Sequence, residues 1–414
     1  MGERVNSAGR RWMFPGRMAG TRAAHAIRMG TAMEKKLRVG ILFGGRSGEH
    51  EVSLLSAASI LEAIDKTKFD VVPIGITKEG RWLAAADARN LLESDPSQAA
   101  KPLAAGDPKA TPGAKLLHEG IPTLLAPEPA AKSGAASAVD VVFPVLHGTF
   151  GEDGTMQGLF ELAGIAYVGS GVLGSSAGMD KDVMKRLFKE AGLPIVKHVT
   201  VLRSEWERSP RKAVAKIEAA LKYPVFVKPA NLGSSVGINK AHDRAELKSA
   251  LTEASRFDRK LVIEQGVGGK KARAREFEVA VLGNDTPEAS VVGEIVPGKE
   301  FYDYEAKYLS EGSVPVIPAK LTKAETKQIR EMAVKAFQVC DLSGLARVDF
   351  LMDPGPKRKI WINEVNTLPG FTRISMYPKL WEATGITYRS LITRLIELAM
   401  ERHADKARTV YSKD

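Results

Sequence analysis

The chain has 414 residues and a formal net charge of +11 at neutral pH, which is long enough for about two or three domains with cores of their own. Hydrophobic residues make up 44% of it and charged residues 26%, as in ordinary globular proteins, and no stretch approaches the roughly 20 apolar residues that span a bilayer. The single cysteine, Cys340, excludes an intrachain disulfide and a thiolate metal cluster. We expect a soluble, cytoplasmic protein with no membrane partner.

The positive charge is concentrated at the N-terminus. Residues 1–38 contain nine Lys and Arg but only two acidic residues, so the rest of the chain carries +4. Without interleaved aromatic residues this composition does not indicate a nucleic-acid partner. We interpret residues 1–35 as a disordered or misassigned basic extension, with Met33 as an alternative start and an organellar transit peptide as the other interpretation.

The segments that follow predict an α/β domain. Short β-rich runs at residues 37–43, 69–77 and 139–146 read as strands, and apolar residues at helical spacing over 49–64 predict a helix. The near-continuous apolar character of the third run is typical of a parallel sheet covered on both faces. Residues 84–137 are rich in Ala, Pro, Gly and Lys, and we expect an irregular excursion with short strands there.

A second unit begins near Asp180, a predicted N-cap for a helix over residues 183–191. Beyond it the pattern changes from alternating helices and strands to strands in succession, which favours an antiparallel sheet. The turn Asp353-Pro354-Gly355-Pro356 predicts that the last two strands are hairpin neighbours. The predicted strands are 195–201, 225–229, 261–264, 277–282, 289–296, 345–352 and 360–364, and the helices are 211–221, 243–255, 322–339 and 386–402.

This hairpin carries the strongest chemical signal. Strand side chains alternate, so Arg347 and Asp349 share one face, and Glu364 and Asn366 share one face of the partner strand. If the two faces coincide, the cluster offers all-oxygen ligands, which suit Mg²⁺ bound to nucleotide phosphates better than zinc. The alternative is a solvated polar face with cross-strand ion pairs.

A glycine-rich loop after a predicted strand indicates phosphate binding. Lys228 ends the strand and residues 231–237, Asn-Leu-Gly-Ser-Ser-Val-Gly, present backbone N–H groups and hydroxyls. Lys181 is a further phosphate candidate. The run 169–174 formally matches the dinucleotide fingerprint, but no acidic residue ends a strand at the required distance, so we interpret it as a structural turn.

Three more segments are candidates for function. Residues 298–312 are glycine-bounded, rich in aromatic and charged residues and aperiodic, which predicts a lid loop. Glu49 lies at a predicted helix N-terminus, and His147 ends an apolar strand, where ligands bind in open α/β sheets. No histidine spacing supports a zinc hydrolase.

Taken together, these motifs resemble the D-alanine–D-alanine ligases of the ATP-grasp fold over about residues 36–402. The resemblance implies an N-terminal α/β domain with a parallel sheet (the pre-ATP-grasp domain) over 36–174, followed by a two-part ATP-grasp fold with an antiparallel sheet. Its central subdomain would cover 175–268 and its C-terminal subdomain 269–402, with the lid at 298–312 and a tail at 403–414.

The resemblance also implies a reaction, in which ATP converts one D-alanine to D-alanyl phosphate and a second D-alanine attacks it, giving a dipeptide for peptidoglycan synthesis. ATP and two Mg²⁺ ions, with Mn²⁺ as an alternative metal, are the implied cofactors, and we expect a homodimer. The residues carried over are Asp349, Glu364 and Asn366 for the metals, Lys181 and Lys228 for phosphates, Glu264 for adenine, Glu276 for ribose and Lys307 for the γ-phosphate.

For the amino-acid substrates, the resemblance assigns Glu49 to the first ammonium, Arg347 and the Gly370 N–H to the oxyanion, and His147 and Ser375 to the substrate sites. Glu49, Ser234 and Tyr308 would latch the lid. Tyr308 stands where the family's depsipeptide-forming members carry histidine, which favours D-alanine over D-lactate as second substrate.

Two segments depart from the family pattern, the extension 1–35 and a basic insertion at residues 270–275. Other carboxylate–amine ligases, a nicotinamide-dependent oxidoreductase and a nucleotide-binding regulatory module are the alternative functions.

Overall fold

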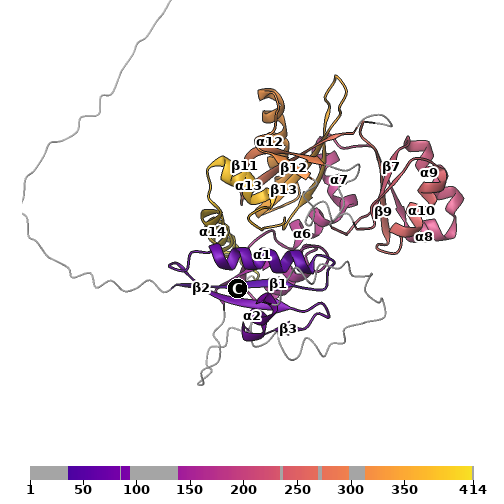
Figure 1. Cartoon of the computed structure of the whole chain (residues 1–414). Coiled ribbons are helices and arrows are strands. Elements are labelled where there is room, and N and C mark those ends of the chain that lie inside the picture. The colour runs from indigo at the N-terminus through magenta and orange to yellow at the C-terminus, as the bar shows by residue number, and fades with distance from the viewer. Residues whose placement is uncertain are drawn as a thin grey trace, which may run out of the picture. The chain divides into compact units, whose positions relative to one another are not determined.

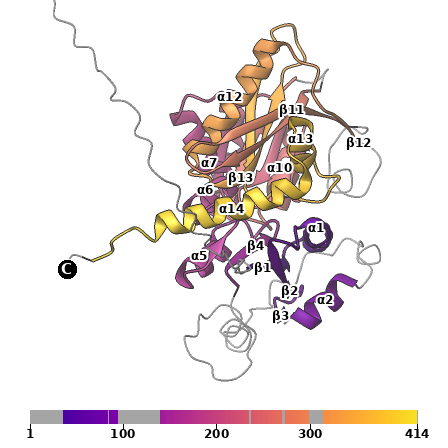
Figure 2. The ribbon, with the colours of Figure 1, turned by 90° about the vertical axis from the view of Figure 1, so that its left-hand side faces the viewer.

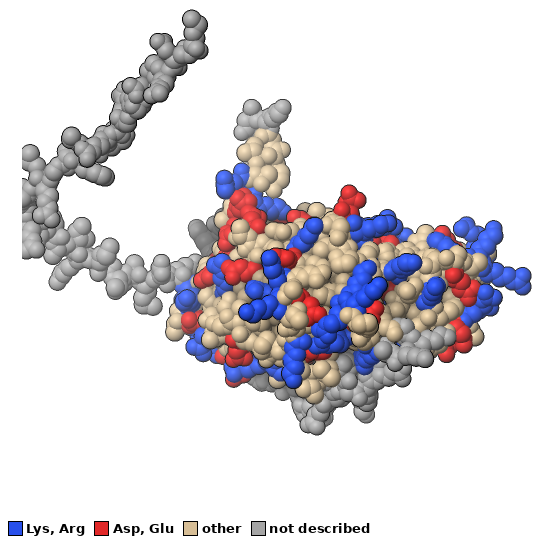
Figure 3. Space-filling view, turned by 90° about the horizontal axis from the view of Figure 1, so that it is seen from above, with Lys and Arg blue, Asp and Glu red and all other residues tan. Residues whose placement is uncertain are grey.

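The structure is a computed structural model that describes residues 36–83, 85–93, 139–233, 236–268, 273–297 and 313–412. All described residues belong to one compact unit, which lies within Lys36–Asp414 (Figure 1). Within the described ranges no helix is long and apolar enough to cross a membrane. On the face seen in Figure 3, Lys and Arg side chains are interspersed with Asp and Glu.

The first sheet has the strand order β3-β2-β1-β4-β5, and β1 pairs in parallel with both β2 and β4. Because the chain places β2 and β4 on opposite sides of β1, the crevice at the carboxyl ends of β1 and β4 is a topological switch point, where α/β folds bind ligands. The strands are β1 (Leu37–Gly44), β2 (Phe69–Ile76), β3 (Trp82–Leu83), β4 (Val141–Val145) and β5 (Ala166–Tyr167), and the helices are α1 (His50–Ala63), α2 (Ala85–Glu93), α5 (Thr155–Leu162) and α6 (Val172–Met179).

A four-stranded antiparallel sheet of order β6-β9-β7-β8 follows. Its core of Leu251, Ile217 and Ile263 lies between the sheet and three helices that cover one face. The strands are β6 (His198–Leu202), β7 (Val225–Pro229), β8 (Asn239–Ala241) and β9 (Lys260–Gln265); the helices are α8 (Arg203–Arg208), α9 (Pro210–Ala220) and α10 (Arg244–Ala254), preceded by α7 (Lys181–Glu190).

The third sheet is antiparallel, of order β12-β11-β10-β13-β14. Its side chains alternate: Val279 and Val348 face a core shared with α7 and α12, whereas Leu282 and Leu345 face a core shared with the first sheet, α13 and α14. Figure 2 shows α14 running between these two sheets. The elements are β10 (Arg275–Gly283), β11 (Glu288–Pro297), β12 (Ser313–Val316), β13 (Gly344–Met352), β14 (Ile360–Asn366), α12 (Lys323–Val339), α13 (Met376–Thr384) and α14 (Tyr388–Lys406).

The predicted mixed α/β and α+β fold class is confirmed, including the parallel first sheet, the antiparallel sheets and the β13–β14 hairpin. The prediction for residues 84–137 is wrong where it can be seen, because residues 85–93 form α2, whose Ala88 and Leu91 pack against Gly75 of β2. The strand predicted from Ile195 begins at His198, since Ile195 bridges Ile362 instead.

The basic segment 270–275 is described only from residue 273, and its last residue, Arg275, opens β10. There it pairs with Glu294 of β11 at 2.7 Å. Arg275 is therefore part of the sheet, and the insertion stays a prediction. The boundaries drawn at residues 174, 268 and 402 stay predictions.

Candidate active site

A row of carboxylates crosses three strands of the third sheet. Asp349 of β13 lies directly opposite Glu278 of β10 on one side and Glu364 of β14 on the other. The next cross-strand pair on the same face joins Arg347 to Asn366. The predicted convergence of Arg347, Asp349, Glu364 and Asn366 is therefore present, on the sheet face opposite α7 and α12.

A β-bulge turns Glu364 toward this face. Ile360, Ile362 and Val365 all point into the core shared with α7 and α12, although uninterrupted alternation would place Val365 on the opposite side from the two isoleucines. Asp349 pairs with Glu364 but Phe350 pairs with Ile362, so Asn363 is the extra residue. Without the bulge, Glu364 would share the buried face of Ile362.

The polar groups of this face are paired with one another. The Arg347 guanidinium donates to both Asp349 oxygens, at 2.7 and 2.8 Å, and its Nε lies 3.2 Å from Glu278 Oε2. Asn366 Nδ2 donates to Asp349 Oδ2 at 3.0 Å. This pairing holds the carboxylates in a fixed orientation and leaves the Asn366 carbonyl oxygen directed away from Asp349.

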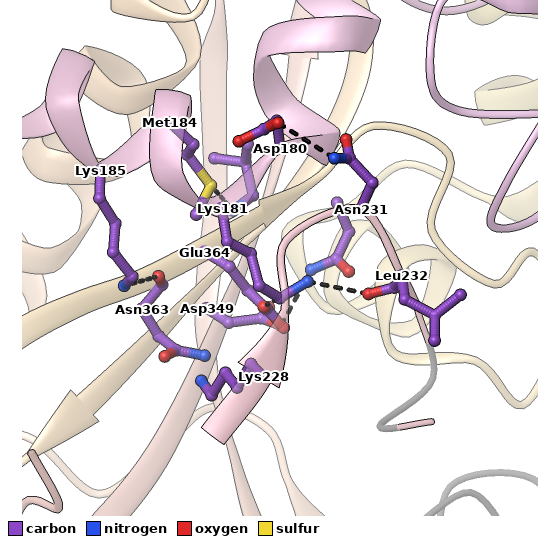
Figure 4. Close-up of polar contacts among 12 residues, drawn as sticks. Asp180, Lys181, Met184, Lys185, Lys228, Asn231, Leu232, Asp349, Asn363 and Glu364 are labelled. Atoms are coloured by element: carbon purple, nitrogen blue, oxygen red, sulfur yellow. Dashed lines mark hydrogen bonds and ion pairs between the residues drawn. The ribbon is translucent and has the colours of Figure 1, made fainter. Parts of the chain in front are cut away.

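Three lysines from α7 and β7 lie near the hairpin (Figure 4). Lys181 Nζ lies 3.7 Å from Glu364 Oε2 and donates to the Leu232 carbonyl at 2.9 Å. Lys185 and Lys228 each place Nζ 2.8 Å from the Glu264 carboxylate. Burial alone would raise the pKa of Glu264, but these two ammonium groups hold it well below its ordinary value, and burial lowers the pKa of Lys185.

A pocket separates the glycine-rich loop from the hairpin. It is lined by Lys181, Leu232 and Gly233, by Glu364 and Asn366 of the hairpin, and by Glu152. Cationic side chains, loop backbone and oxygen ligands thus meet in one space. This is the arrangement that binding of a metal-complexed polyphosphate requires.

The switch point of the first sheet opens on the same space. Glu49 is 6% exposed, and its carboxylate reaches past Gly148 and Gly233: a Cβ on either glycine would lie 3.3 Å from a Glu49 oxygen. Gly148 also has φ = +74°, a conformation that favours glycine. Glu49 is the N-cap residue of α1, but its side chain does not cap the helix.

His147 and Glu152 hold the chain just after β14. His147 Nδ1 donates to the Leu368 carbonyl at 2.8 Å, and Glu152 accepts from Leu368 N at 2.9 Å and from Gly148 N at 2.7 Å. Burial lowers the pKa of His147 to about 4 and raises that of Glu152 to about 7. The imidazole is neutral, with a buried Nε2 that has no hydrogen-bond partner among the described residues.

Three further predicted residues are described by the structure, and the others are not. Gly370 follows the clamped Leu368 peptide, and Ser375 is the N-cap residue of α13, with its Oγ 2.7 Å from Thr372 Oγ1. Glu276, at the start of β10, pairs with Arg273 at 3.1 Å. Ser234, Lys307, Tyr308 and the lid 298–312 lie outside the described residues.

The residues present fit Mg²⁺ bound together with a nucleotide. Among the described residues no three His, Cys, Asp or Glu side chains form a metal site by themselves. Asp349, Glu364 and Asn366 offer a few oxygen ligands on one sheet face, and Mg²⁺ ordinarily completes its octahedron with phosphate oxygens and water. The neighbouring lysine-lined pocket is where those phosphates would lie.

Comparison with known proteins identifies the family. The model of the D-ala D-ala ligase N-terminus matches residues 38–170, and that of the D-ala D-ala ligase C-terminus matches residues 187–397. The chain belongs to the D-alanine–D-alanine ligase family. Ligases of this name from Geobacillus kaustophilus and Heliobacterium modesticaldum are 49% and 50% identical to it, covering 91% and 90% of this chain and 98% and 97% of theirs.

Two solved structures of ligases are similar to this chain in fold. The D-alanine-D-alanine ligase from Coxiella burnetii is 36% identical, with a TM-score of 0.71 over 91% of this chain and 97% of its own. The VanG D-Ala:D-Ser ligase from Enterococcus faecalis is 35% identical, with a TM-score of 0.71 over 88% of this chain and all of its own. The resemblance inferred from the motifs is confirmed.

Sequence reasoning missed three buried charges of this ligase site. Glu152 lies shortly after His147, in the run His147-Gly148-Thr149-Phe150-Gly151-Glu152. Glu278 lies in an alternating strand, and Lys185 lies one helical turn after Lys181. Two signals in the sequence could have found Glu278 and Lys185. Lys185 is four residues after Lys181 and so lies on the same helix face, and Glu278 alternates with the apolar Phe277 and Val279 and so points to the opposite sheet face.

Proposed function

We propose that the protein joins two D-alanine molecules into D-alanyl-D-alanine with hydrolysis of ATP to ADP and phosphate. The observation that carries the proposal is the row of Asp349 and Glu364 facing Lys181 across the pocket beside the glycine-rich loop. It combines oxygen ligands and phosphate-binding cations in one space. Family membership supports the choice of D-alanine over other carboxylate substrates.

In this proposal the nucleotide binds between the second and third sheets. Lys181 and Lys228 bind phosphate oxygens, Glu264 binds the adenine side and Glu276 the ribose, and Lys307 binds the γ-phosphate. Asp349, Glu364 and Asn366 hold two Mg²⁺ ions, with Mn²⁺ as an alternative. When bound, the metal neutralises charge on the transferring phosphoryl group. The ion pairs of Lys228 and Lys185 with Glu264 support the assignment, because they fix that carboxylate in its ionised form.

The chemistry takes place between the hairpin and the switch point. The carboxylate of the first D-alanine attacks the γ-phosphorus and ADP leaves; the neutral amine of the second then attacks the acyl carbon, and phosphate leaves with the bonding electron pair. Arg347 and the Gly370 N–H stabilise the oxyanion of the tetrahedral intermediate. Glu49 binds the first ammonium, and His147 and Ser375 contact the substrates. The described position of Glu49 beside Gly148 and Gly233 supports this arrangement.

The test is release of ADP with ATP and Mg²⁺ on adding D-alanine, compared with L-alanine, D-serine and D-lactate. We expect D-alanine alone to give full turnover. The double variant Glu364→Gln/Asn366→Ala should abolish ADP release and keep the melting temperature, because these side chains ligate metal and do not fill the core. Near-normal turnover of that variant at saturating Mg²⁺ would contradict the metal assignment.

The second substrate is a separate question, since one similar structure is a D-Ala:D-Ser ligase. We propose that Tyr308 and Ser234, with Glu49, latch the lid, and that the neutral phenol admits the amine of D-alanine where an imidazolium would favour the lactate carboxylate. Competition between D-alanine and D-lactate at pH 7, with the products resolved by mass, is the experiment. Equal amounts of dipeptide and depsipeptide would refute the role of Tyr308.

We also propose that the enzyme works in the cytoplasm as a homodimer. ATP and a peptidoglycan precursor dipeptide are both handled there, and sedimentation equilibrium of the purified chain measures the assembly state. A monomer at micromolar concentration would exclude the homodimer and leave the reaction unaffected.

A further inference from the structure

At the bulge, β14 has two backbone groups that the sheet cannot satisfy. β14 is an edge strand of the third sheet, so the Asn363 carbonyl and the Val365 N–H point away from β13 and toward α7. A buried backbone group without a partner costs about as much as a lost hydrogen bond. Some other element must therefore supply these partners if the bulge is to persist.

Two successive residues of α7 supply them. Lys185 Nζ donates to the Asn363 carbonyl at 3.0 Å, and the Val365 N–H donates to Met184 Sδ at 3.3 Å. Figure 4 shows both side chains reaching from α7 to β14, beside Lys181. The residue between these two backbone groups is Glu364, the candidate metal ligand. Its side chain points to the sheet face that carries Asp349, opposite the core shared with α7 and α12.

The Lys185 ammonium is itself fixed. Its side chain is fully buried, and Nζ lies 2.8 Å from Glu264 Oε1, while Glu264 Oε2 lies 2.8 Å from Lys228. A buried ammonium is tolerated only when it is paired and hydrogen-bonded. Lys185 therefore joins one carboxylate of the second sheet to the bulge of the third, the two sheets between which the proposed nucleotide site lies.

We propose that Lys185 is a positioning residue that holds the Asn363 bulge and thereby directs the Glu364 carboxylate into the metal site. Lys185 touches neither metal nor nucleotide. Loss of its hydrogen bond to Asn363 lets β14 return toward regular alternation, which turns Glu364 toward the buried side. The inference rests on the proposed function, because it assumes that Glu364 binds Mg²⁺.

The experiment measures the Mg²⁺-dependent gain in ADP affinity, that is, the ratio of the dissociation constants measured calorimetrically with EDTA and with Mg²⁺. Lys185→Met keeps the length and apolar stem of the side chain and removes the ammonium. We expect the gain to fall by about tenfold or more, as is usual when a partner of a metal ligand is lost. Lys189→Met, on an exposed residue of the same helix, is the matched control and should keep the full gain.

A double-mutant cycle separates positioning from general destabilisation. In a Glu364→Gln background, Lys185→Met should reduce the gain no further, because the ligand it positions is already gone. If Lys185→Met does not fold, Lys185→Met/Glu264→Gln carries the same measurement without a buried carboxylate that has lost one of its two ammonium partners, and the ratio cancels any loss of contact with the base.

A full Mg²⁺-dependent gain in a folded Lys185 variant, or equal losses in the wild-type and Glu364→Gln backgrounds, would overturn the positioning role while leaving the ligase assignment intact. A wild-type protein whose ADP affinity does not respond to Mg²⁺ would overturn the proposed metal site and this inference with it.

Discussion

Asp180 has two structural roles, which can be separated by comparing its substitution with that of a residue that has only one of them. Its Oδ1 accepts from the N–H groups of Asp182 and Val183 and so caps α7, each at 3.1 Å. Its Oδ2 accepts from Asn231 Nδ2 at 3.0 Å and forms an ion pair with Lys260. One carboxylate therefore begins the helix that carries Lys181 and ties it to the loop after β7 and to β9.

The cost of Asp180→Ala follows from these contacts. Loss of the N-cap costs about 1 kcal/mol, and leaving the largely buried Lys260 and Asn231 without this acceptor adds about 1–3 kcal/mol. The expected loss of unfolding free energy is therefore about 2–4 kcal/mol. Asp243→Ala is the matched control, because Asp243 caps α10 through Ala245 and Glu246 on the surface, and only the capping contribution of about 1 kcal/mol should be lost.

Urea unfolding followed by tryptophan fluorescence measures both variants. Burial alone would raise the pKa of Asp180, but hydrogen bonds from Lys260, Val183 and Asn231 outweigh it and hold the pKa below its ordinary value. The stabilisation is therefore present above the ordinary pKa of about 4 and is lost as the pH falls below it, so the gap between the variants should be constant from pH 6 to 8. Equal losses for the two variants would refute the tertiary contribution.

Three further predictions concern other parts of the chain. A protein that starts at Met33 should keep the activity and melting temperature of the full chain, since residues 1–32 carry few large apolar groups and no periodicity; a midpoint several degrees lower would show that they dock. Cys340 is 1% exposed and burial raises its pKa to about 12, so a thiol reagent at pH 8 should label it only after unfolding, and rapid native labelling would contradict its burial. The pKa of His147 is lowered to about 4 from an ordinary 6.5, so the free energy of unfolding of the wild type should fall as the pH falls from 6.5 toward 4. In urea titrations, His147→Gln should lose less of this free energy than the wild type between pH 7.5 and 5.5. Equal losses in the two proteins would exclude this histidine as the cause.

Local signals in the sequence predicted the elements that carry the site. Asp180 before an amphipathic run predicted the start of α7, and a Pro-Gly turn between two alternating strands predicted the β13–β14 hairpin with Asp349 beside Glu364. These predictions succeeded because capping and hairpin pairing are decided within a few residues.

The orientation of Glu364 could not be derived in the same way. Strict alternation from Ile360 and Ile362 would place Glu364 on their buried face, and only the bulge at Asn363 reverses it. The backbone groups on either side of Glu364 bond to Lys185 and Met184, which lie 178 and 181 positions earlier in the chain than their partners. Contacts at such separation leave no local pattern, and a lysine in a helix is ordinarily a surface residue.

The core that α14 shares with the first sheet has a consequence for synthesis on the ribosome. The apolar side chains of α14 pack in one cluster with those of the first sheet; the members used here are Leu391, Ile392 and Leu395 of α14 and Val39, Val141 and Val168. The first sheet therefore lacks part of its apolar cover until α14 has left the ribosome. At about 5–20 residues per second, translation from Val168 to Leu391 takes on the order of 10–45 s, during which this surface is open to chaperones and proteases. Limited proteolysis of ribosome-bound chains should show protection of the first sheet rising when a chain extends past α14, and equal protection of shorter chains would show that the sheet folds without it.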